Sequence, residues 1–167
     1  MTNHSSAEFS EMGTEDLHEW LESLWGEYEE SLRRSGESEA AARTNVARNR
    51  RELFDGDEPK AGHHFFVLRS GTEVVGRVWI AVQSESPTEA YIFDVIVPEE
   101  RRGEGWGREA MLRAETWARG KGISRLGLNV FGYNTVARRL YESLGYRETA
   151  IRMLKDLDPP VEKETIH

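Results

Sequence analysis

Three glycines at alternate positions form a possible anion-binding loop. Gly103, Gly105 and Gly107 stand directly before a segment that is predicted to be a helix. Glycine accepts positive φ and lets the backbone approach a ligand closely. Successive N–H groups can then face one concavity, and the helix N-terminus adds about half a positive charge. Arg102 and Arg108 flank the loop, so it suits a pyrophosphate, although a turn that only connects a strand to a helix would use the same glycines.

Two familiar nucleotide-binding patterns do not fit this loop. A Walker loop needs Lys followed by Ser or Thr after its glycines, and no such pair follows here. A dinucleotide fingerprint follows its strand directly, but this loop begins several residues beyond Val97, and Arg108 occupies the position of the third glycine. The next strand also ends at Asn129-Val130 rather than at an acid. Both patterns are therefore excluded.

One acid and two histidines are further candidates for chemistry. Asp94 is the only ionisable acid in the apolar run 91–97. A carboxylate in such a run is costly to bury alone, so Asp94 is predicted to have a partner or a chemical role. His63 and His64 open a strand without an acid or cysteine at metal-ligand spacing. A hydrogen-bonding or surface role is preferred for them, and no metal site is predicted.

The elements that must position these residues begin with two helices. A short edge strand is predicted within 7–12, after which apolar residues recur at helical spacing from Thr14, a candidate N-cap. Ser38 can cap a second helix that ends near Phe54. The apolar face of this second helix is thin, so we expect it to be partly exposed. Residues 55–62, with two glycines and a proline, are predicted to be a loop.

The remaining chain predicts a sheet with crossover helices. The order of strands and helices is typical of a mixed sheet with an antiparallel meander, an α/β or α+β layered domain. A single domain over 1–167 is expected, with loose tails at 1–6 and 157–167. The predicted segments are strands over 65–68, 74–82, 91–97, 126–130 and 147–155, and helices over 107–119 and from Asn134 to Gly145.

The amino-acid composition and net charge of the chain limit which binding partners are expected. The chain has 167 residues and no cysteine, which excludes disulfides, thiolate metal sites and cysteine nucleophiles and makes a reducing cytoplasm the simplest setting. No window approaches about 18 consecutive apolar residues, so no membrane span is predicted. The net charge of −8 speaks against bulk nucleic-acid binding, although arginines gather in two short stretches. Neither a membrane nor a nucleic acid is therefore expected as a partner.

Two segments resemble motifs of the GCN5-related N-acetyltransferase (GNAT) superfamily. Residues 97–107, VPEERRGEGWG, look like the family's [Q/R]-x-x-G-x-[G/A] loop. Residues 134–146, NTVARRLYESLGY, resemble its N-x-x-A-x-x-L-Y-x-x-x-G-[F/Y] segment. The two motifs come in the family's order and at about its spacing, and the elements match from His63 to Lys155. The resemblance therefore implies the GNAT fold, with two splayed parallel strands, and acetyl-CoA as co-substrate without a metal.

The resemblance also implies which residues would hold acetyl-CoA. The strand that ends at Val97 and the strand that ends at Val130 would splay apart around it. Asn134 would contact the cofactor while it caps the last helix. Arg138 is expected either to reach a phosphate or to remain a solvated helix arginine. The backbone of Val95, Ile96 and Val97 would receive the pantetheine arm, and the amides of Arg102, Gly103, Glu104, Gly105, Trp106, Gly107 and Arg108 would hold the pyrophosphate.

Tyr141 and Asp94 are the expected catalytic residues. The family tyrosine that matches Tyr141 lies near the cofactor sulfur, where a phenol can protonate the leaving thiolate. The alternative is an aromatic residue on the apolar stripe of its helix. Family members often carry an acid or histidine on the strand before the loop, but Tyr91 and Phe93 occupy two of those places. Asp94 is therefore expected to act as base or acceptor anchor, or else as a structural hydrogen-bonding acid.

Two classes of function follow from the resemblance. The first is an N-acetyltransferase that transfers an acetyl group to a primary amine by direct attack in a ternary complex. The second is a non-catalytic acyl-CoA-binding module that keeps the loop without the chemistry. Retention of both Tyr141 and Asp94 favours the enzyme. The sequence leaves the amine acceptor open, as well as acetyl against a longer acyl group and monomer against homodimer.

Overall fold

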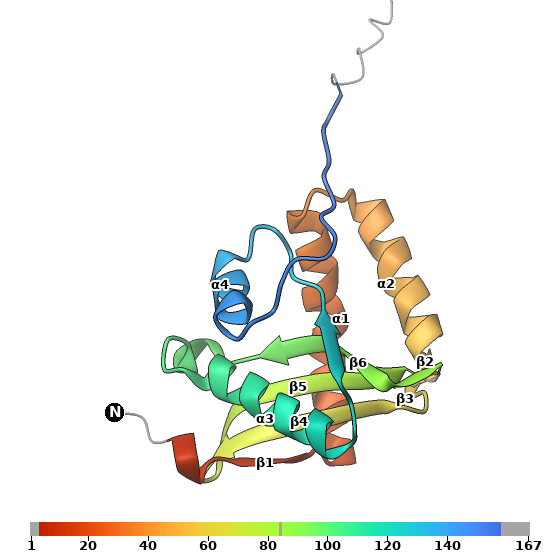
Figure 1. Ribbon diagram of the computed structural model, residues 1–167. Helices are drawn as coiled ribbons and strands as arrows, with labels where there is room; N and C mark the ends of the chain where they lie inside the picture. The colour runs from red at the N-terminus through yellow and green to blue at the C-terminus, as the bar shows by residue number, and fades with distance from the viewer. Residues whose placement is uncertain (1–3, 84, 158–167) are drawn as a thin grey trace, which may run out of the picture.

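A five-stranded mixed sheet forms the centre of the protein (Figure 1). The computed structural model describes residues 4–83 and 85–157. The first four strands pair antiparallel and the last adds parallel to its neighbour, so the mixed sheet predicted from the sequence is confirmed. In spatial order the strands are β1 (Glu8–Glu11), β4 (His63–Ser70), β5 (Glu73–Gln83), β6 (Ser86–Ile96) and β7 (Arg125–Leu128).

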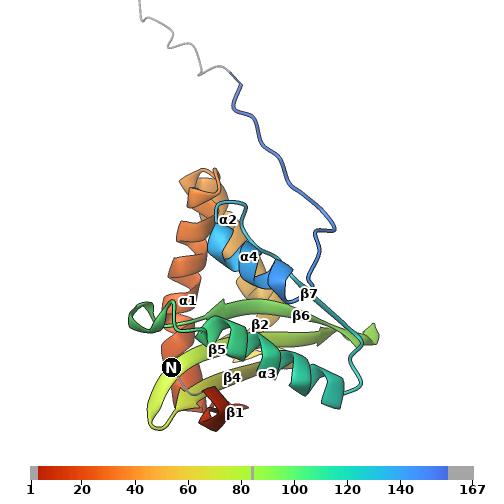
Figure 2. The same ribbon diagram turned by 60° about the vertical axis from the view of Figure 1, so that its left-hand side comes forward.

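Helices cover both faces of the sheet (Figures 1 and 2). α1 (Thr14–Arg34) packs on one face, with α2 (Glu39–Leu53) beside it, and α3 (Trp106–Gly120) packs on the other. α4 (Thr135–Ser143) follows β7. Among the described helices, none is long and apolar enough to cross a membrane.

Alternation along the strands builds two separate cores. In β4, Phe66 faces α3 and packs with Met111, while the neighbouring Phe65 faces α1 and packs with Trp20. Three alanines on α3 are buried against the sheet, which lets the helix axis approach closely. Burial of each large apolar side chain contributes about 1.5–3 kcal/mol. The two cores fix the sheet between α1 and α3 and thereby fix where β6 and β7 end.

Several N-terminal expectations are corrected in detail. Ser38 caps α2 as predicted, because its Oγ accepts from the Ala41 N–H, but Thr14 is the first residue of α1 and Gly13 takes the N-cap position without a side-chain bond. Within the tail predicted over 1–6, His4–Ser6 form a short 3-10 helix, η1, while 1–3 lie outside the described residues. The loop predicted over 55–62 contains a hairpin of β2 (Phe54–Asp55) and β3 (Glu58–Pro59).

The strand predicted over 147–155 is not found in the structure. α4 is followed by Gly145 at φ +93°, which stops the helix as predicted, but residues 147–157 have no regular structure and leave the body of the molecule (Figures 1 and 2). β-propensity gives a segment a preference for extended backbone, but a strand also needs a neighbour, and none pairs with this segment among the described residues. Residues 158–167 of the predicted tail lie outside the described residues.

Candidate active site

The two parallel strands separate where the resemblance implies an opening. β6 and β7 are paired from Glu89↔Arg125 to Ile92↔Leu128, and the pairing stops there although β6 continues to Ile96. The edge of 95–97 that faces β7 therefore has no strand partner among the described residues. A backbone edge of this kind can accept hydrogen bonds from, and donate them to, an extended ligand.

A β-bulge lies at the opening and turns a side chain. Trp79 is opposite Asp94 while Ile80 is opposite Ile92, so Phe93 is the extra residue. Phe93 stacks on Trp79 with ring centroids 4.7 Å apart, so Phe93 and Asp94 both lie on the α1 side of the sheet. Bulges commonly re-aim side chains beside active sites. Here the bulge sets the carboxylate of Asp94 next to the end of the paired region.

The pKa of Asp94 is raised to about 7. Burial is the main cause, because a carboxylate loses hydration when it ionises away from water. The negative charge of Glu27 on α1 adds to the effect, and a hydrogen bond from the Val95 backbone opposes it. No cation contributes to the shift. The carboxylate therefore exchanges its proton near neutral pH, which suits a group that must accept a proton there.

The pKa of Tyr141 is raised to about 12. Burial is again the main cause, followed by the charge of Asp94, so the carboxylate on β6 acts electrostatically on the phenol on α4. Tyr141 packs against the core on the α3 side, with its ring centroid 6.0 Å from that of Tyr146. The phenol stays protonated at neutral pH and can only donate a proton. The charge of Asp94 thus acts on Tyr141, and the roles of the two residues stay predictions.

The glycine loop between β6 and α3 leaves the helix N-terminus without a side-chain cap. Gly103 and Gly105 adopt φ +79° and +89°, in the left-handed region that favours glycine. Gly105 is the N-cap of α3 and provides no side-chain bond, so the first amides of the helix remain available to a ligand. Gly107 serves a different purpose, because a Cβ there would lie 3.3 Å from Cδ2 of Leu140. This close approach joins the start of α3 to α4.

A polar cluster supports the loop from behind. Trp106 is 1% exposed, and its Nε1 donates to the Glu104 carboxylate at 2.9 Å. Arg101 forms an ion pair with the same carboxylate at 3.1 Å. His4 from η1 contacts the Glu104 carbonyl at 2.9 Å and packs edge-on against Trp106. The negative charge of Glu104 is therefore neutralised beside the exposed amides, which keeps the loop suitable for an anion.

Part of this cluster could not be predicted from sequence patterns. His4 falls in a polar tail without periodicity, and Arg101 could not be distinguished from its neighbour Arg102 by pattern alone. The contact between His4 and Glu104 joins residues 100 positions apart in the sequence, so it depends on the tertiary fold. A residue near the N-terminus of the chain, His4, thus helps to hold the loop.

The arginines near the loop are engaged to different degrees. Arg102 and Arg108 are exposed, and they donate to the Val97 carbonyl at 3.2 Å and to Ser143 Oγ at 2.9 Å. Neither forms an ion pair among the described residues, so both keep their charge beside the loop. Arg138 instead forms an ion pair with Glu148, which a phosphate would have to displace.

Asn134 and His63 have clear structural roles. Asn134 Oδ1 accepts from the Ala137 N–H at 3.1 Å, which confirms the predicted cap of α4. His63 Nδ1 accepts from Trp79 Nε1 at 2.9 Å, and burial lowers the pKa of this histidine. The predicted hydrogen-bonding role of His63 is thereby found. No group of three or more potential metal ligands occurs among the described residues.

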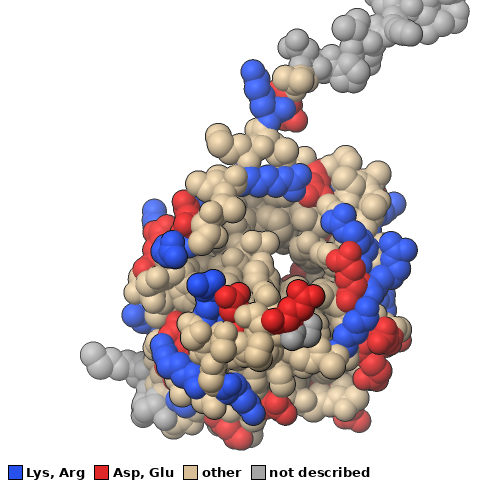
Figure 3. Space-filling model, turned by 45° about the vertical axis from the view of Figure 1, so that its right-hand side comes forward, with Lys and Arg blue, Asp and Glu red and all other residues tan. Residues whose placement is uncertain are grey.

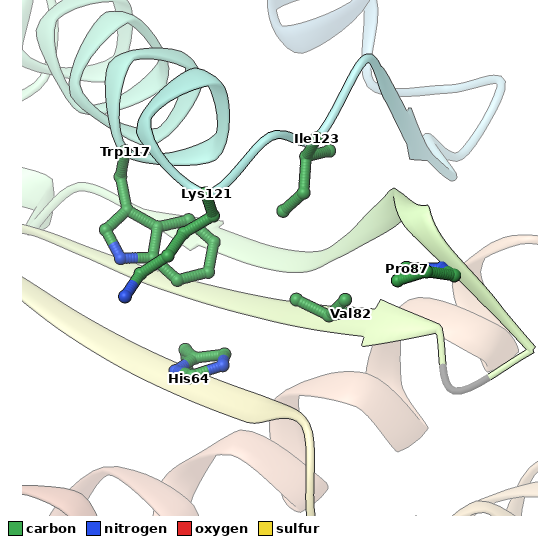
Figure 4. A pocket seen from close by; sticks show the side chains of 6 residues that line it. All are labelled: His64, Val82, Pro87, Trp117, Lys121 and Ile123. Atoms are coloured by element: carbon green, nitrogen blue, oxygen red, sulfur yellow. The ribbon is translucent and has the colours of Figure 1, made fainter.

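Two cavities lie away from the opening between β6 and β7. One of about 330 Å³ sits at the C-terminal end of α3, opposite to the glycine loop at its N-terminal end, and is lined by residues such as His64, Trp117 and Lys121 (Figure 4). The other, of about 440 Å³, lies between α1, α2 and β2, beside Trp25 and Arg50. Neither is lined by a residue of the loop or by Asp94 or Tyr141.

One face of the molecule is hollowed, and acidic and basic side chains both surround the opening at its centre (Figure 3). Nucleic-acid-binding surfaces gather positive charge on one face. The mixed charge seen on this face, with the net −8 of the chain, is unlike such a surface.

A family model described as the acetyltransferase (GNAT) family matches residues 15–146. The chain belongs to this family. The match includes the splayed strands, the glycine loop and the segment that carries Tyr141. Members of the GNAT family use acetyl-CoA as co-substrate, which fits uncapped amides at the start of α3 flanked by two guanidinium groups that form no ion pair among the described residues.

Relatives of the GNAT chain include two proteins of Bacillus subtilis (strain 168). YycN, an uncharacterised N-acetyltransferase, is 39% identical over 97 residues, which are 57% of this chain and 62% of YycN. YdgE, also an uncharacterised N-acetyltransferase, is 34% identical over 99 residues, 58% of this chain and 63% of YdgE. The matches thus span less than two thirds of the length of these relatives. The crystal structure of YycN is 31% identical with a TM-score of 0.84, and covers 92% of this chain and 100% of that chain.

Proposed function

We propose that this GNAT protein transfers an acetyl group from acetyl-CoA to a primary amine by direct attack in a ternary complex. One observation carries the proposal: the Asp94 carboxyl group, with a pKa of about 7, lies on β6 just beyond its pairing with β7, and its charge helps to raise the pKa of the Tyr141 phenol to about 12. A proton acceptor and a proton donor of this kind are what amine acylation needs at neutral pH.

The donor substrate fits the residues that surround the opening. The free backbone edge of 95–97 can pair with an extended chain that carries amides, such as pantetheine. The exposed amides at the start of α3, together with Arg102 and Arg108, can hold a pyrophosphate. Asn134 and Arg138 lie at the start of α4, and we propose that they contact the same cofactor after Arg138 leaves Glu148.

The proposed reaction takes two protons from the nitrogen, gives one to the sulfur, and replaces a C–S bond with a C–N bond. The acceptor arrives as an ammonium ion and must lose a proton, which passes to the Asp94 carboxylate and then to solvent. The neutral amine attacks the thioester carbonyl, an N–C bond forms, and the tetrahedral intermediate collapses with cleavage of the C–S bond. The departing thiolate takes a proton from Tyr141, and solvent returns a proton to the phenol. The second amine proton leaves to solvent as the amide forms.

The alternative, a non-catalytic acyl-CoA-binding module, is separated from the enzyme by two measurements. Acetyl-CoA should raise the melting temperature of the protein in either case, because a ligand that binds only the folded state stabilises it. Steady release of free CoA thiol with a panel of primary amines occurs only if the protein is a transferase. A melting shift without thiol release from any amine would support the binding module and contradict the proposed transfer.

A further inference from the structure

The short helix η1 (His4–Ser6) lies behind the glycine loop, although it belongs to the far edge of the sheet. It leads directly into β1, the edge strand at the opposite side of the sheet from β7. Ala7, between η1 and β1, is 6% exposed and belongs to the core on the α3 side. Figure 1 shows η1 and the start of α3 at the same end of the molecule. The N-terminal segment can therefore influence the loop from outside the opening between β6 and β7.

A hydrogen bond joins η1 to the backbone of the loop. Nε2 of His4 lies 2.9 Å from the carbonyl oxygen of Glu104, in a partly buried position. A carbonyl oxygen can only accept, so the histidine nitrogen is the donor. No backbone N–H of a described residue donates to this carbonyl. His4 therefore provides a partner for a polar group that the loop and α3 leave without a backbone bond.

The planar geometry of the peptide transmits this bond to the other side of the loop. The peptide between Glu104 and Gly105 is trans, so its C=O and its N–H point in opposite directions. A carbonyl held toward His4 thus turns the Gly105 N–H away from η1. That N–H donates to no backbone carbonyl among the described residues. It is therefore available to a ligand on the side of the loop that faces away from η1.

The ring of His4 also packs closely on the loop. A Cβ on Gly105 would lie 3.1 Å from His4 Cε1, which is tighter than ordinary van der Waals contact. The same glycine adopts φ +89°, a conformation that residues with side chains rarely take. His4 packs edge-on against Trp106, with ring centroids 4.3 Å apart. Position 105 must therefore be glycine both for its backbone conformation and for the approach of the histidine ring.

The side chain of Glu104 is held by other residues. Its carboxylate accepts from Trp106 Nε1 at 2.9 Å and forms an ion pair with Arg101 at 3.1 Å. Arg101 also approaches Glu73, at 3.5 Å. These contacts fix the carboxylate, but none of them involves the backbone atoms of Glu104. The contact with His4 is thus the one that acts directly on the direction of the peptide.

We propose that η1 acts as a brace for the binding of acetyl-CoA. His4 holds the Glu104 carbonyl so that the Gly105 N–H faces the pyrophosphate, and bound acetyl-CoA in turn holds η1 against the loop. The coupling acts in both directions, because an effect of one binding event on another is reciprocal. His4 is a positioning residue, since it acts through the loop and not on acetyl-CoA itself. The inference rests on the binding of acetyl-CoA at the loop, as proposed above.

The affinity for acetyl-CoA gives the first test. Loss of the hydrogen bond in His4→Ala should raise the Kd for acetyl-CoA about 3- to 10-fold, the effect expected of one neutral hydrogen bond, while kcat hardly changes. His4→Gln can place an amide N–H near the position of Nε2 and should recover part of the affinity. The control His18→Ala removes an exposed histidine from α1 and should leave the Kd unchanged. Titration calorimetry measures the Kd, and steady-state kinetics measure kcat.

The outcomes of this test separate the brace from the proposed function. A wild type that does not bind acetyl-CoA would overturn both. Binding by the wild type together with the same Kd for His4→Ala would overturn the brace alone. A higher Kd that His18→Ala shares would also contradict the brace, because the effect would then not depend on the loop. Far-UV circular dichroism checks that each variant is folded.

Hydrogen exchange of the wild type tests the reverse direction without any variant. The Ala7 N–H donates to the His4 carbonyl at 3.1 Å, so its exchange reports on the opening of η1. Saturating acetyl-CoA should slow this exchange by about the factor by which His4→Ala raises the Kd. The control is the Lys60 N–H, which donates to the Leu53 carbonyl at the end of α2 and should exchange at an unchanged rate. Unchanged exchange at Ala7, or equal slowing at both amides, would overturn the proposal.

Discussion

At the scale of single residues, burial shifts two ionisable groups in the same direction but suits them to opposite tasks. It raises the pKa of Asp94 to about 7 and the pKa of Tyr141 to about 12. At neutral pH the carboxylate is therefore a proton acceptor close to its own pKa, and the phenol is a firmly protonated donor. The charge of Asp94 is one cause of the shift at Tyr141, so a change at one group should alter the other.

The variant Asp94→Asn should remove the acidic limb of the pH–rate profile. In the wild type the carboxylate is ionised above about pH 7, so kcat/KM should rise with pH and level off above that value. Loss of a general base typically costs about 10²- to 10⁴-fold in rate. The measurement is kcat/KM of the wild type and of Asp94→Asn between about pH 5.5 and pH 9, roughly the range in which the carboxyl group titrates. Normal turnover with an unchanged acidic limb would exclude Asp94 as base.

The same variant should stabilise the fold at alkaline pH. Because the folded pKa of about 7 lies above the ordinary value of 3.8, the folded state loses stability as pH rises from 3.8 to about 7, and the loss is complete above that value. Asp94→Asn should therefore raise the free energy of unfolding at pH 8 by roughly 1 to 3 kcal/mol, with allowance for partial exposure of the side chain. The gain should shrink toward pH 5. A gain that stays constant with pH would mean that the shift is not caused by ionisation.

The variant Tyr141→Phe separates chemistry from packing. It keeps the ring in the core beside Tyr146 and removes only the hydroxyl. If the phenol protonates the thiolate, kcat should fall about 10²-fold or more while the affinity for acetyl-CoA hardly changes. Stopped assays for kcat and a melting shift for acetyl-CoA affinity measure the two quantities separately. Unchanged kcat would assign Tyr141 to the apolar stripe of α4 alone.

At the scale of elements, the glycine loop and the start of α3 form a binding device that is independent of the catalytic pair. Positive φ at Gly103 and Gly105 turns the chain so that the first amides of α3 are free, and Trp106 anchors the turn in the core. Arg108 stands at the same end of the helix, whereas Arg119 stands at the far end in an ion pair with Glu115. The two arginines thus make a matched pair for a test of binding.

Replacement of Arg108 by Ala should raise the KM for acetyl-CoA several-fold with little change in kcat, because the side chain adds charge to the phosphate cradle without touching the reacting atoms. Charged hydrogen bonds contribute about 1.5–3 kcal/mol when well formed and less when exposed. The control Arg119→Ala should leave the KM unchanged. Equal effects of the two variants would show that general charge, and not the loop, governs acetyl-CoA binding.

Elements with a local cause were predictable from the sequence. Ser38 and Asn134 cap their helices because their side-chain oxygens bond to amides three residues ahead, which needs no tertiary information. The bulge at Phe93 was not predicted, because a bulge is a mismatch between two strands and the run 91–97 alone does not specify its register against β5. The contact of His4 with the loop depends on tertiary packing in the same way.

At the scale of the whole molecule, the sequence predicted the strands around the candidate site more accurately than it predicted the C-terminal segment. The motifs around the loop and Tyr141 carry the family's fold with them, so the splay between β6 and β7 was expected and is present. The strand expected over 147–155 has the right residues but no strand neighbour among residues 4–83 and 85–157, because sequence patterns give propensity and not pairing partners.

The most direct test of the account is product identification. The wild-type protein and the double variant Asp94→Asn/Tyr141→Phe are incubated with acetyl-CoA and a panel of primary amines, and each amine is examined by mass spectrometry for the acetamide. The account predicts an N-acetylated amine with the wild type, formed together with an equal amount of free CoA thiol, and at most traces with the double variant. An equal yield of acetamide from both proteins, or thiol release without any acetylated amine, would contradict it.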